Sequence, residues 1–339
     1  MSGEHPLRVG VDIGGTFTDI VFVMADGTLH KRKVPSTPAD YSTAIIEGIS
    51  AFCAEHGIAA PRIAEVQHAT TVATNAILER KGARTALLTT EGFRDVLELR
   101  RIRIPMSYDL DWQKPLPLVE REWRIEVRER LDAQGKVLTE LDPRALEPVI
   151  DSLRAGDIEA VAVCLLHSYR NPQHEITVVD LLRERLPSVY VSASHYVLPE
   201  MLEFERTSTT VVNAYVAPLI ARYLTALRAR LEELGTKAPL LVMQSNGGLI
   251  SATVAAQRPV TIIESGPAAG VVAALRLARD CGYPDVLTLD MGGTTTKASI
   301  IEQGEILRAT EYEVGSAVSI SSRLMRGNGY VLRIPVIDI

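Results

Sequence analysis

One pattern occurs twice in this chain, and it constrains the fold more than any other feature. Residues 9–23 read VGVDIGGTFTDIVFV, and residues 287–301 read LTLDMGGTTTKASII. Each copy has an apolar strand, a turn with one aspartate and two glycines, and a second β-rich segment that continues into a hairpin. The two aspartates lie 278 residues apart (290 − 12). That spacing is too long for a solenoid repeat and is typical of duplicated domains.

The repeated turn has the composition of a phosphate-binding loop. Glycine lets the backbone approach a phosphate closely because it has no Cβ atom. Consecutive backbone N–H groups form an anion-binding concavity, and an aspartate can hold a hydrated divalent cation. A single copy is equally compatible with a plain hairpin, but two copies that face each other across a cleft could bind one polyphosphate from both sides. The candidate residues are Asp12, Gly14, Gly15, Thr16 and Thr18, with Asp290, Gly292, Gly293, Thr294 and Thr296 at the matching positions.

Length and composition limit the class of protein. The chain has 339 residues, of which 46% are hydrophobic, and this suits about two globular domains. A net charge of −6 argues against a general nucleic-acid-binding protein. The three cysteines form no CxxC motif, which suggests a reducing compartment without structural zinc. We find no signal peptide and no apolar run of the roughly 20 residues that span a bilayer, so we expect a cytoplasmic protein that does not bind membranes.

The order of strands and helices predicts an α/β layer architecture. Residues 68–75, HATTVATN, lie at an expected strand-to-helix turn, where backbone N–H groups can face an anion. His68 could carry a proton or bind a ligand, with Thr71 and Asn75 as further contacts. The alternative is a helix-capping cluster beside a core histidine with satisfied hydrogen bonds, which composition alone favours.

Two further segments carry open alternatives. Arg206 precedes a long helical pattern, and it could pair with the neighbouring Glu203 and Glu205 or bind an anionic group of a substrate. Gln244 and Asn246 belong to the sequence QSNGG, which follows an expected strand. These amides could bind a small polar ligand, or the segment could be a plain hairpin turn, because Asn-Gly is typical of such turns.

The duplicated loops resemble phosphate 1 and phosphate 2 of the actin, sugar-kinase and Hsp70 superfamily of ATPases. Residues 263–270, IESGPAAG, resemble the first connecting motif of that superfamily, and they begin an expected helix that reaches about Ala278. The resemblance implies a duplicated actin-like, ribonuclease H-like α/β fold that binds ATP and Mg²⁺. It also implies that Thr295 and Gly266 help to hold phosphates, and that Glu264 orients the attacking group.

Five segments resemble one branch of that superfamily, the hydantoinase A, 5-oxoprolinase and ketone-carboxylase family. They read VDIGGTFTDIVF, HATTVATN, ERTSTTVVNAYV, VMQSNGG and ESGPAAG. This resemblance implies an ATP-dependent cyclic-amide hydrolase that phosphorylates a carbonyl oxygen, or the ATP-using subunit of a ketone carboxylase. The resemblance also implies a hetero-oligomer with a hydantoinase B type subunit. A rival of another class is a nucleotide-gated binding module like Hsp70 or actin, which would turn over no small molecule.

The same resemblance predicts how the chain is divided. Residues 1–195 would be the N-terminal region with the first loop, and residues 196–339 would begin the hydantoinase A domain with the connecting helix and the second loop. Full-length members are about twice as long, and their glycine-rich segment follows a strand similar to residues 334–339. We therefore expect an incomplete second domain and an adenine site beyond Ile339.

Overall fold

The computed structural model describes residues 7–37, 40–101, 110–291, 296–315 and 329–339. The chain forms two compact units, and each is assembled from separate stretches of sequence. The chain passes between the units within α2 (Val72–Leu78) and again within α7 (Glu203–Glu233). The first unit comprises Met1–Asn75, Ile220–Arg308 and Pro335–Ile339, and the second comprises Ala76–Leu219 and Ala309–Ile334.

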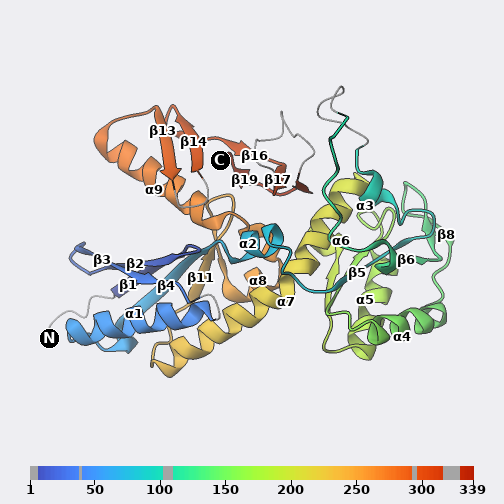
Figure 1. Cartoon of the computed structure of the whole chain (residues 1–339), viewed down its shortest axis with the longest axis horizontal. Coiled ribbons are helices and arrows are strands. Elements are labelled where there is room, and N and C mark those ends of the chain that lie inside the picture. Colours follow the sequence, from blue (N-terminus) through green and yellow to red (C-terminus); the bar gives the residue numbers. More distant parts are fainter. Residues whose placement is uncertain (1–6, 38–39, 102–109, 292–295, 316–328) are drawn as a thin grey trace. The chain divides into compact units, whose positions relative to one another are not determined.

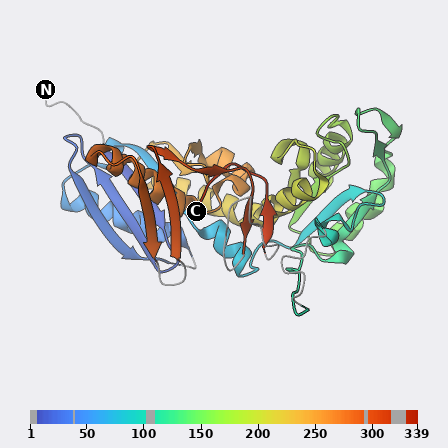
Figure 2. The same ribbon diagram turned by 90° about the horizontal axis from the view of Figure 1, so that it is seen from above.

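A six-stranded mixed sheet forms the centre of the first unit (Figures 1 and 2). Its order is β12-β11-β4-β1-β2-β3, in which β1, β4 and β11 run parallel and the other neighbours are antiparallel. Apolar residues alternate along β1, so every second side chain is buried, as expected for a strand with one face on the core. The strands are β1 (Leu7–Ile13), β2 (Phe17–Val23), β3 (Leu29–Pro35), β4 (Ile63–Thr70), β11 (Leu240–Met243) and β12 (Leu249–Ser251).

Helix α1 (Tyr41–Glu55) packs on β2 and β3. Asp40 caps its first turn by accepting a hydrogen bond from the backbone N–H of Ser42, and Gly57 follows its end with a φ of +62°. Phe52 of this helix stacks on Phe22 of β2 with ring centroids 3.7 Å apart. Local capping signals and sheet packing therefore agree on where this helix lies.

Helix α9 (Ser265–Cys281) lies between two sheets of the first unit (Figure 1). It contacts β4 and β11 on one side and the antiparallel sheet β13-β14-β15 on the other. A small core of Ala268, Val271, Ile301, Ile306 and Ile337 joins helix and sheet. The remaining elements of this unit are η1 (Ala60–Arg62), α8 (Ala252–Gln257), η4 (Pro259–Ile262), β13 (Val286–Met291), β14 (Thr296–Glu302), β15 (Glu305–Ile306) and β19 (Val336–Ile337), and β16 (Arg308–Ala309) lies at the unit boundary.

The two copies of the repeated sequence form hairpins with the same register. In the first hairpin Ile13 pairs with Thr18, and in the second Met291 pairs with Thr296. Both pairs are related by the same offset of 278 residues (291 − 13 and 296 − 18). The predicted duplication is therefore a duplication of backbone structure as well as of sequence.

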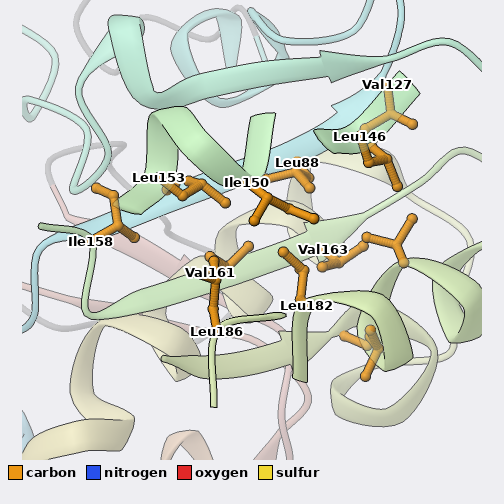
Figure 3. Packing of buried hydrophobic residues seen from close by; sticks show 14 of the residues in the cluster. Leu88, Val127, Leu146, Ile150, Leu153, Ile158, Val161, Val163, Leu182 and Leu186 are labelled. Carbon is orange, nitrogen blue, oxygen red and sulfur yellow. The ribbon is translucent and has the colours of Figure 1, made fainter. Parts of the chain in front are cut away.

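The second unit contains a four-stranded parallel sheet in the order β10-β9-β5-β6. All residues of β5 and β9 are buried, as expected for central strands covered on both faces. Figure 3 shows the core on one side, where Leu88, Val161 and Val163 meet Ile150 and Leu182. The elements are β5 (Thr85–Thr90), α3 (Val96–Leu99), η2 (Arg121–Trp123), β6 (Arg124–Val127), β7 (Arg130–Leu131), β8 (Val137–Thr139), η3 (Pro143–Leu146), α4 (Glu147–Ala155), β9 (Ala160–Cys164), α5 (Gln173–Arg185), β10 (Tyr190–Ala193), α6 (Ser194–Val197), β17 (Tyr312–Val314) and β18 (Tyr330–Leu332).

Helix α7 corrects one sequence expectation. Within the described residues, it is the one helix that is long and apolar enough to span a membrane by length and composition. However, 78% of its most apolar window is buried inside the protein, which is the pattern of a core helix. An apolar run of spanning length therefore exists, and its hydrophobicity serves packing within the two units.

Candidate functional site

The carboxyl ends of β1, β4 and β11 lie at one edge of the six-stranded sheet, because these three strands are parallel neighbours. Asp12 lies at the end of β1, Thr70 ends β4, and Gln244 follows β11. In α/β sheets, ligands bind at this edge. The sheet thus gathers three segments that the sequence singled out, although they are far apart along the chain.

The first glycine loop is closed by its own hydrogen bonds. The backbone N–H of Gly14 donates to the carbonyl of Phe17 at 2.9 Å. Ser36 braces the loop, since its backbone N–H donates to the carbonyl of Thr16 and its hydroxyl donates to the carbonyl of Gly14, both at 2.9 Å. The hydroxyl of Thr18 is fully buried and lies 3.0 Å from that of Ser36. Thr18 therefore supports the loop from the protein interior, whereas Gly15 and Thr16 are exposed.

Asp12 and Asp290 are close enough for their charges to interact. The pKa of Asp12 is raised from 3.8 to about 6, chiefly by the protein atoms packed around its carboxylate and then by the negative charges of Asp19 and Asp290, while Lys33 opposes the shift. By solvent accessibility, Asp12 is nevertheless exposed, so an ion can reach it. A carboxylate beside like charges is stabilised by a cation, and oxygen ligands of this kind suit Mg²⁺. The residues present therefore fit the metal that the family resemblance implies.

The first turn of α9 lies against Asp12. A Cβ atom on Gly266 would be only 3.0 Å from Oδ1 of Asp12, so glycine allows this close approach. The turn is anchored to the end of β4, since the hydroxyl of Ser265 donates to the carbonyl of Thr70 at 2.9 Å and accepts from its N–H at 3.0 Å. A helix N-terminus favours negative charge. The connecting motif thus brings the start of α9 against the carboxylate of Asp12.

Glu264 caps α9 with a left-handed backbone, at φ +61° and ψ +27°. Such a conformation costs a non-glycine residue about 1–3 kcal/mol and persists only where its surroundings enforce it. Here the backbone N–H of Glu264 donates to the hydroxyl of Thr74 at 3.1 Å. The carboxylate pairs with the ammonium of Lys297 at 3.1 Å, and both side chains are less than a fifth exposed.

The segment of residues 68–75 divides into a part at the site and a part in the core. Thr71 lies at the first loop, where its hydroxyl donates to the carbonyl of Ile13 at 3.1 Å, and the amide of Asn75 donates to that hydroxyl at 3.4 Å. His68 is 1% exposed, and its Nε2 lies 2.8 Å from the hydroxyl of Tyr223. Burial lowers the pKa of His68 to about 4, so the ring is neutral at pH 7. This placement agrees with a core histidine, but its hydrogen bonds are only half satisfied, since no partner is found for the buried Nδ1 among the described residues.

Gln244 and Asn246 form the turn of the hairpin that joins β11 to β12. The side chain of Asn246 accepts from the N–H of Gly248 at 2.8 Å, and Gly247 takes a φ of +87°. The turn stands at the same sheet edge as Asp12. Its hairpin role is therefore clear, while a role in binding a ligand stays a prediction.

Arg206 belongs to the second unit, where it is 1% exposed. One guanidinium nitrogen donates to the carbonyl of Leu165 at 2.9 Å and to the hydroxyls of Ser168 and Ser194. These bonds tie the start of α7 to the end of β9. These hydrogen bonds of Arg206 are therefore structural, and its binding of a substrate anion stays a prediction.

Four candidate residues, Gly292, Gly293, Thr294 and Thr295, lie outside the described residues. The flanking strands of their hairpin are described, and they place Asp290 directly across from Lys297. Sequence reasoning did not single out Lys297. A signal was available, because Lys297 occupies the position of Asp19 in the first copy (19 + 278) and reverses its charge.

Comparison with known proteins defines the class to which this arrangement belongs. Over 98% of its length, the chain superposes on 47% of a nucleotide-free structure of acetone carboxylase, with a TM-score of 0.86 and 28% identity. The ATP-dependent caprolactamase of Pseudomonas jessenii gives a TM-score of 0.81 and 35% identity over the same shares of the two chains. The chain has the actin-like ATPase fold of these enzymes.

The family follows from the sequence match. Residues 8–186 match the hydantoinase/oxoprolinase N-terminal region, and residues 206–339 match the hydantoinase/oxoprolinase domain. The chain belongs to this family. It is 41% identical to an uncharacterised protein of Methanocaldococcus jannaschii, and 38% identical to caprolactamase subunit alpha of Pseudomonas jessenii over 89% of this chain. It covers 49% and 44% of these two proteins, so it spans about half the length of the curated relatives it matches.

Proposed function

We propose that this chain is the ATP-using part of an enzyme that activates a poorly reactive carbonyl compound by phosphorylating its oxygen. The observation that carries the proposal is the pairing of two like hairpins in one compact unit, in which the charge of Asp290 acts on Asp12. Two equivalent loops whose acidic residues interact can bind one polyphosphate and its metal between them.

The residues have distinct roles in this proposal. The backbone N–H groups of Gly15 and Thr16 and the hydroxyl of Thr16 hold phosphate oxygens, and Gly14, whose own N–H closes the loop, lets the phosphate approach the backbone. The second loop does the same through Gly292, Gly293, Thr294 and Thr295. Asp12 and Asp290 hold Mg²⁺, mostly through water. A Mg²⁺ ion held there would offset the negative charge that develops during phosphoryl transfer. Thr71 and Asn75 support the first loop.

In this proposal, Glu264 orients the attacking group. Its strained backbone is held by Thr74, and its carboxylate stands at the start of α9, beside the turn that contacts Asp12. The carbonyl oxygen of the substrate attacks the terminal phosphorus of ATP, and ADP leaves. Transfer of this kind depends on positioning and charge neutralisation more than on covalent chemistry.

The leading substrate class is a cyclic amide, as in 5-oxoprolinase or hydantoinase. A lactam carbon is a poor electrophile, and phosphorylation turns its oxygen into a leaving group, so water can then open the ring. The 38% identity to a caprolactamase subunit supports this choice. The second candidate is a ketone carboxylase, which the higher TM-score to acetone carboxylase supports. Because the caprolactamase relative is a subunit, we further propose a hetero-oligomer with a hydantoinase B type subunit.

Release of ADP by the assembled enzyme tests the proposal. We expect Mg²⁺-dependent ADP release that rises at least tenfold with one substrate class when 5-oxoproline, hydantoin, caprolactam, and acetone with bicarbonate are compared. Asp12→Ala and Asp290→Ala should each abolish it, with circular dichroism unchanged. Nucleotide-dependent association with a protein, without stimulation by any of these compounds, would instead favour a binding module of the Hsp70 or actin type.

A further inference from the structure

The two hairpins differ in charge at one equivalent position. Asp19 in the first hairpin pairs with Lys33 of the adjacent strand β3 at 2.7 Å, and both side chains are at least half exposed. Lys297 in the second hairpin pairs instead with Glu264 at 3.1 Å, and these side chains are 19% and 13% exposed. The second pair therefore leaves the sheet and joins a hairpin strand to the start of α9.

Lys297 also stands beside the acidic centre of the site. It is the direct cross-strand partner of Asp290 in the antiparallel ladder, and directly opposed residues have Cβ atoms about 4.5–5.5 Å apart. Its backbone therefore lies opposite Asp290, while its ammonium pairs with the carboxylate of Glu264. The hairpin strand that carries Asp290 thus also carries the cation that pairs with Glu264.

The backbone of Glu264 is fixed, but its side chain needs its own restraint. Thr74 accepts from the N–H of Glu264, and Ser265 is bonded in both directions to Thr70, so the start of α9 cannot shift easily. A glutamate side chain still has three rotatable bonds. Among the described residues, Glu264 makes its side-chain ion pair with Lys297, and this pair favours one direction for the carboxylate.

We propose that Lys297 is a positioning residue, whose ammonium holds the carboxylate of Glu264 in the direction needed to orient the attacking group. This inference rests on the proposed phosphoryl transfer. It assigns to Lys297 no contact with the transferred group, and it therefore predicts an effect on turnover and little effect on nucleotide affinity.

A double-mutant cycle in the assembled enzyme tests this role. Lys297→Met keeps the length of the side chain and removes its charge, and we expect kcat for ADP release to fall about 10- to 100-fold, because small misplacements at a reacting centre have effects of this size. KM for ATP should stay within about threefold. Glu264→Gln should lower kcat similarly, the double variant should be no worse than Glu264→Gln, and Lys297→Arg should restore most of the lost activity.

The matched control is Arg276→Met, which breaks an exposed ion pair with Asp280 on the same helix α9 and should leave kcat unchanged. Additive effects of Lys297→Met and Glu264→Gln would overturn the proposal, and so would a raised KM for ATP with normal kcat, which indicates a direct phosphate ligand. Failure of the wild-type enzyme to release ADP would contradict the proposed function instead. In that case, a crystal structure of Lys297→Met tests the positioning role by itself. A Glu264 carboxylate that has not moved would refute that role.

Discussion

Replacing Gly266 by alanine would place a methyl group against the carboxylate of Asp12. The new Cβ atom would lie 3.0 Å from Oδ1, whereas ordinary contacts begin at 3.4 Å. The carboxylate must therefore move by about 0.4 Å (3.4 − 3.0). Its backbone cannot follow, because Asp12 is paired with Asp19 on one side and Ala69 on the other.

Gly266→Ala should change kcat and the free energy of unfolding by amounts that can be estimated separately. A misplacement of 1 Å at a reacting centre can reduce the rate about 100-fold, so a shift of 0.4 Å should reduce kcat about 5- to 10-fold. Alanine is favoured over glycine inside a helix by about 0.5–1 kcal/mol, and tight packing costs about 1–3 kcal/mol. The free energy of unfolding should therefore fall by no more than about 2.5 kcal/mol.

Gly270→Ala on the same helix is the matched control. Gly270 is exposed, and an added Cβ atom would have no neighbour within 4 Å. We expect this variant to gain about 0.5–1 kcal/mol of stability with unchanged turnover. Mg²⁺-dependent ADP release and denaturant unfolding of both variants provide the measurement. Wild-type kcat and Mg²⁺ affinity in Gly266→Ala would refute the placement of Asp12, and equal losses in both variants would show that α9 tolerates no alanine for another reason.

Four other outcomes are expected. In Mg²⁺-free protein, ¹³C NMR should give Asp12 a pKa near 6, and Asp290→Asn should lower it by less than about one unit, because burial is the larger cause. Since the raised pKa favours the protonated form in the folded state, Asp12→Asn should become more stable relative to wild type in melts with EDTA as pH rises from about 4 to 7. Gly156→Ala would place Cβ 2.0 Å from the Trp123 ring and should destabilise the second unit by about 1–3 kcal/mol, as followed by tryptophan fluorescence. Tyr223→Phe should cost about 1–3 kcal/mol in denaturant unfolding, because it leaves His68 without this partner.

Local signals predicted those parts of the fold whose chemistry is local. The first glycine loop and the hairpin that continues each copy of the repeat depend on residues within a few positions of one another. The sequence alone predicts helix for the charged residues 91–103, yet the described part of that segment contains only α3, Val96–Leu99. Residues of helical propensity do not form a stable helix without an apolar face that packs on the rest of the protein.

The site itself was predictable where its residues repeat. The sequence singled out Asp12, Asp290 and the start of α9. The two aspartates lie in different sheets, and helix α9 packs against both sheets. His68 and Thr71 show the limit, because residues three positions apart in one segment have different surroundings. Only the partner at position 223 reveals that His68 faces the core.

Differences between the two copies are as informative as their identities. The repeated aspartate, glycines and threonine predict what both hairpins share, which is a backbone turn that can face phosphate. Position 19 and its equivalent 297 sit in the same register, yet one carries an aspartate that pairs within its own sheet and the other a lysine that reaches Glu264. Phosphoryl transfer is asymmetric, because one side of the phosphate faces the leaving group and the other faces the attacking group. A duplicated hairpin can serve such a reaction only if the copies differ, and the reversed charge at this position is a difference of the required kind.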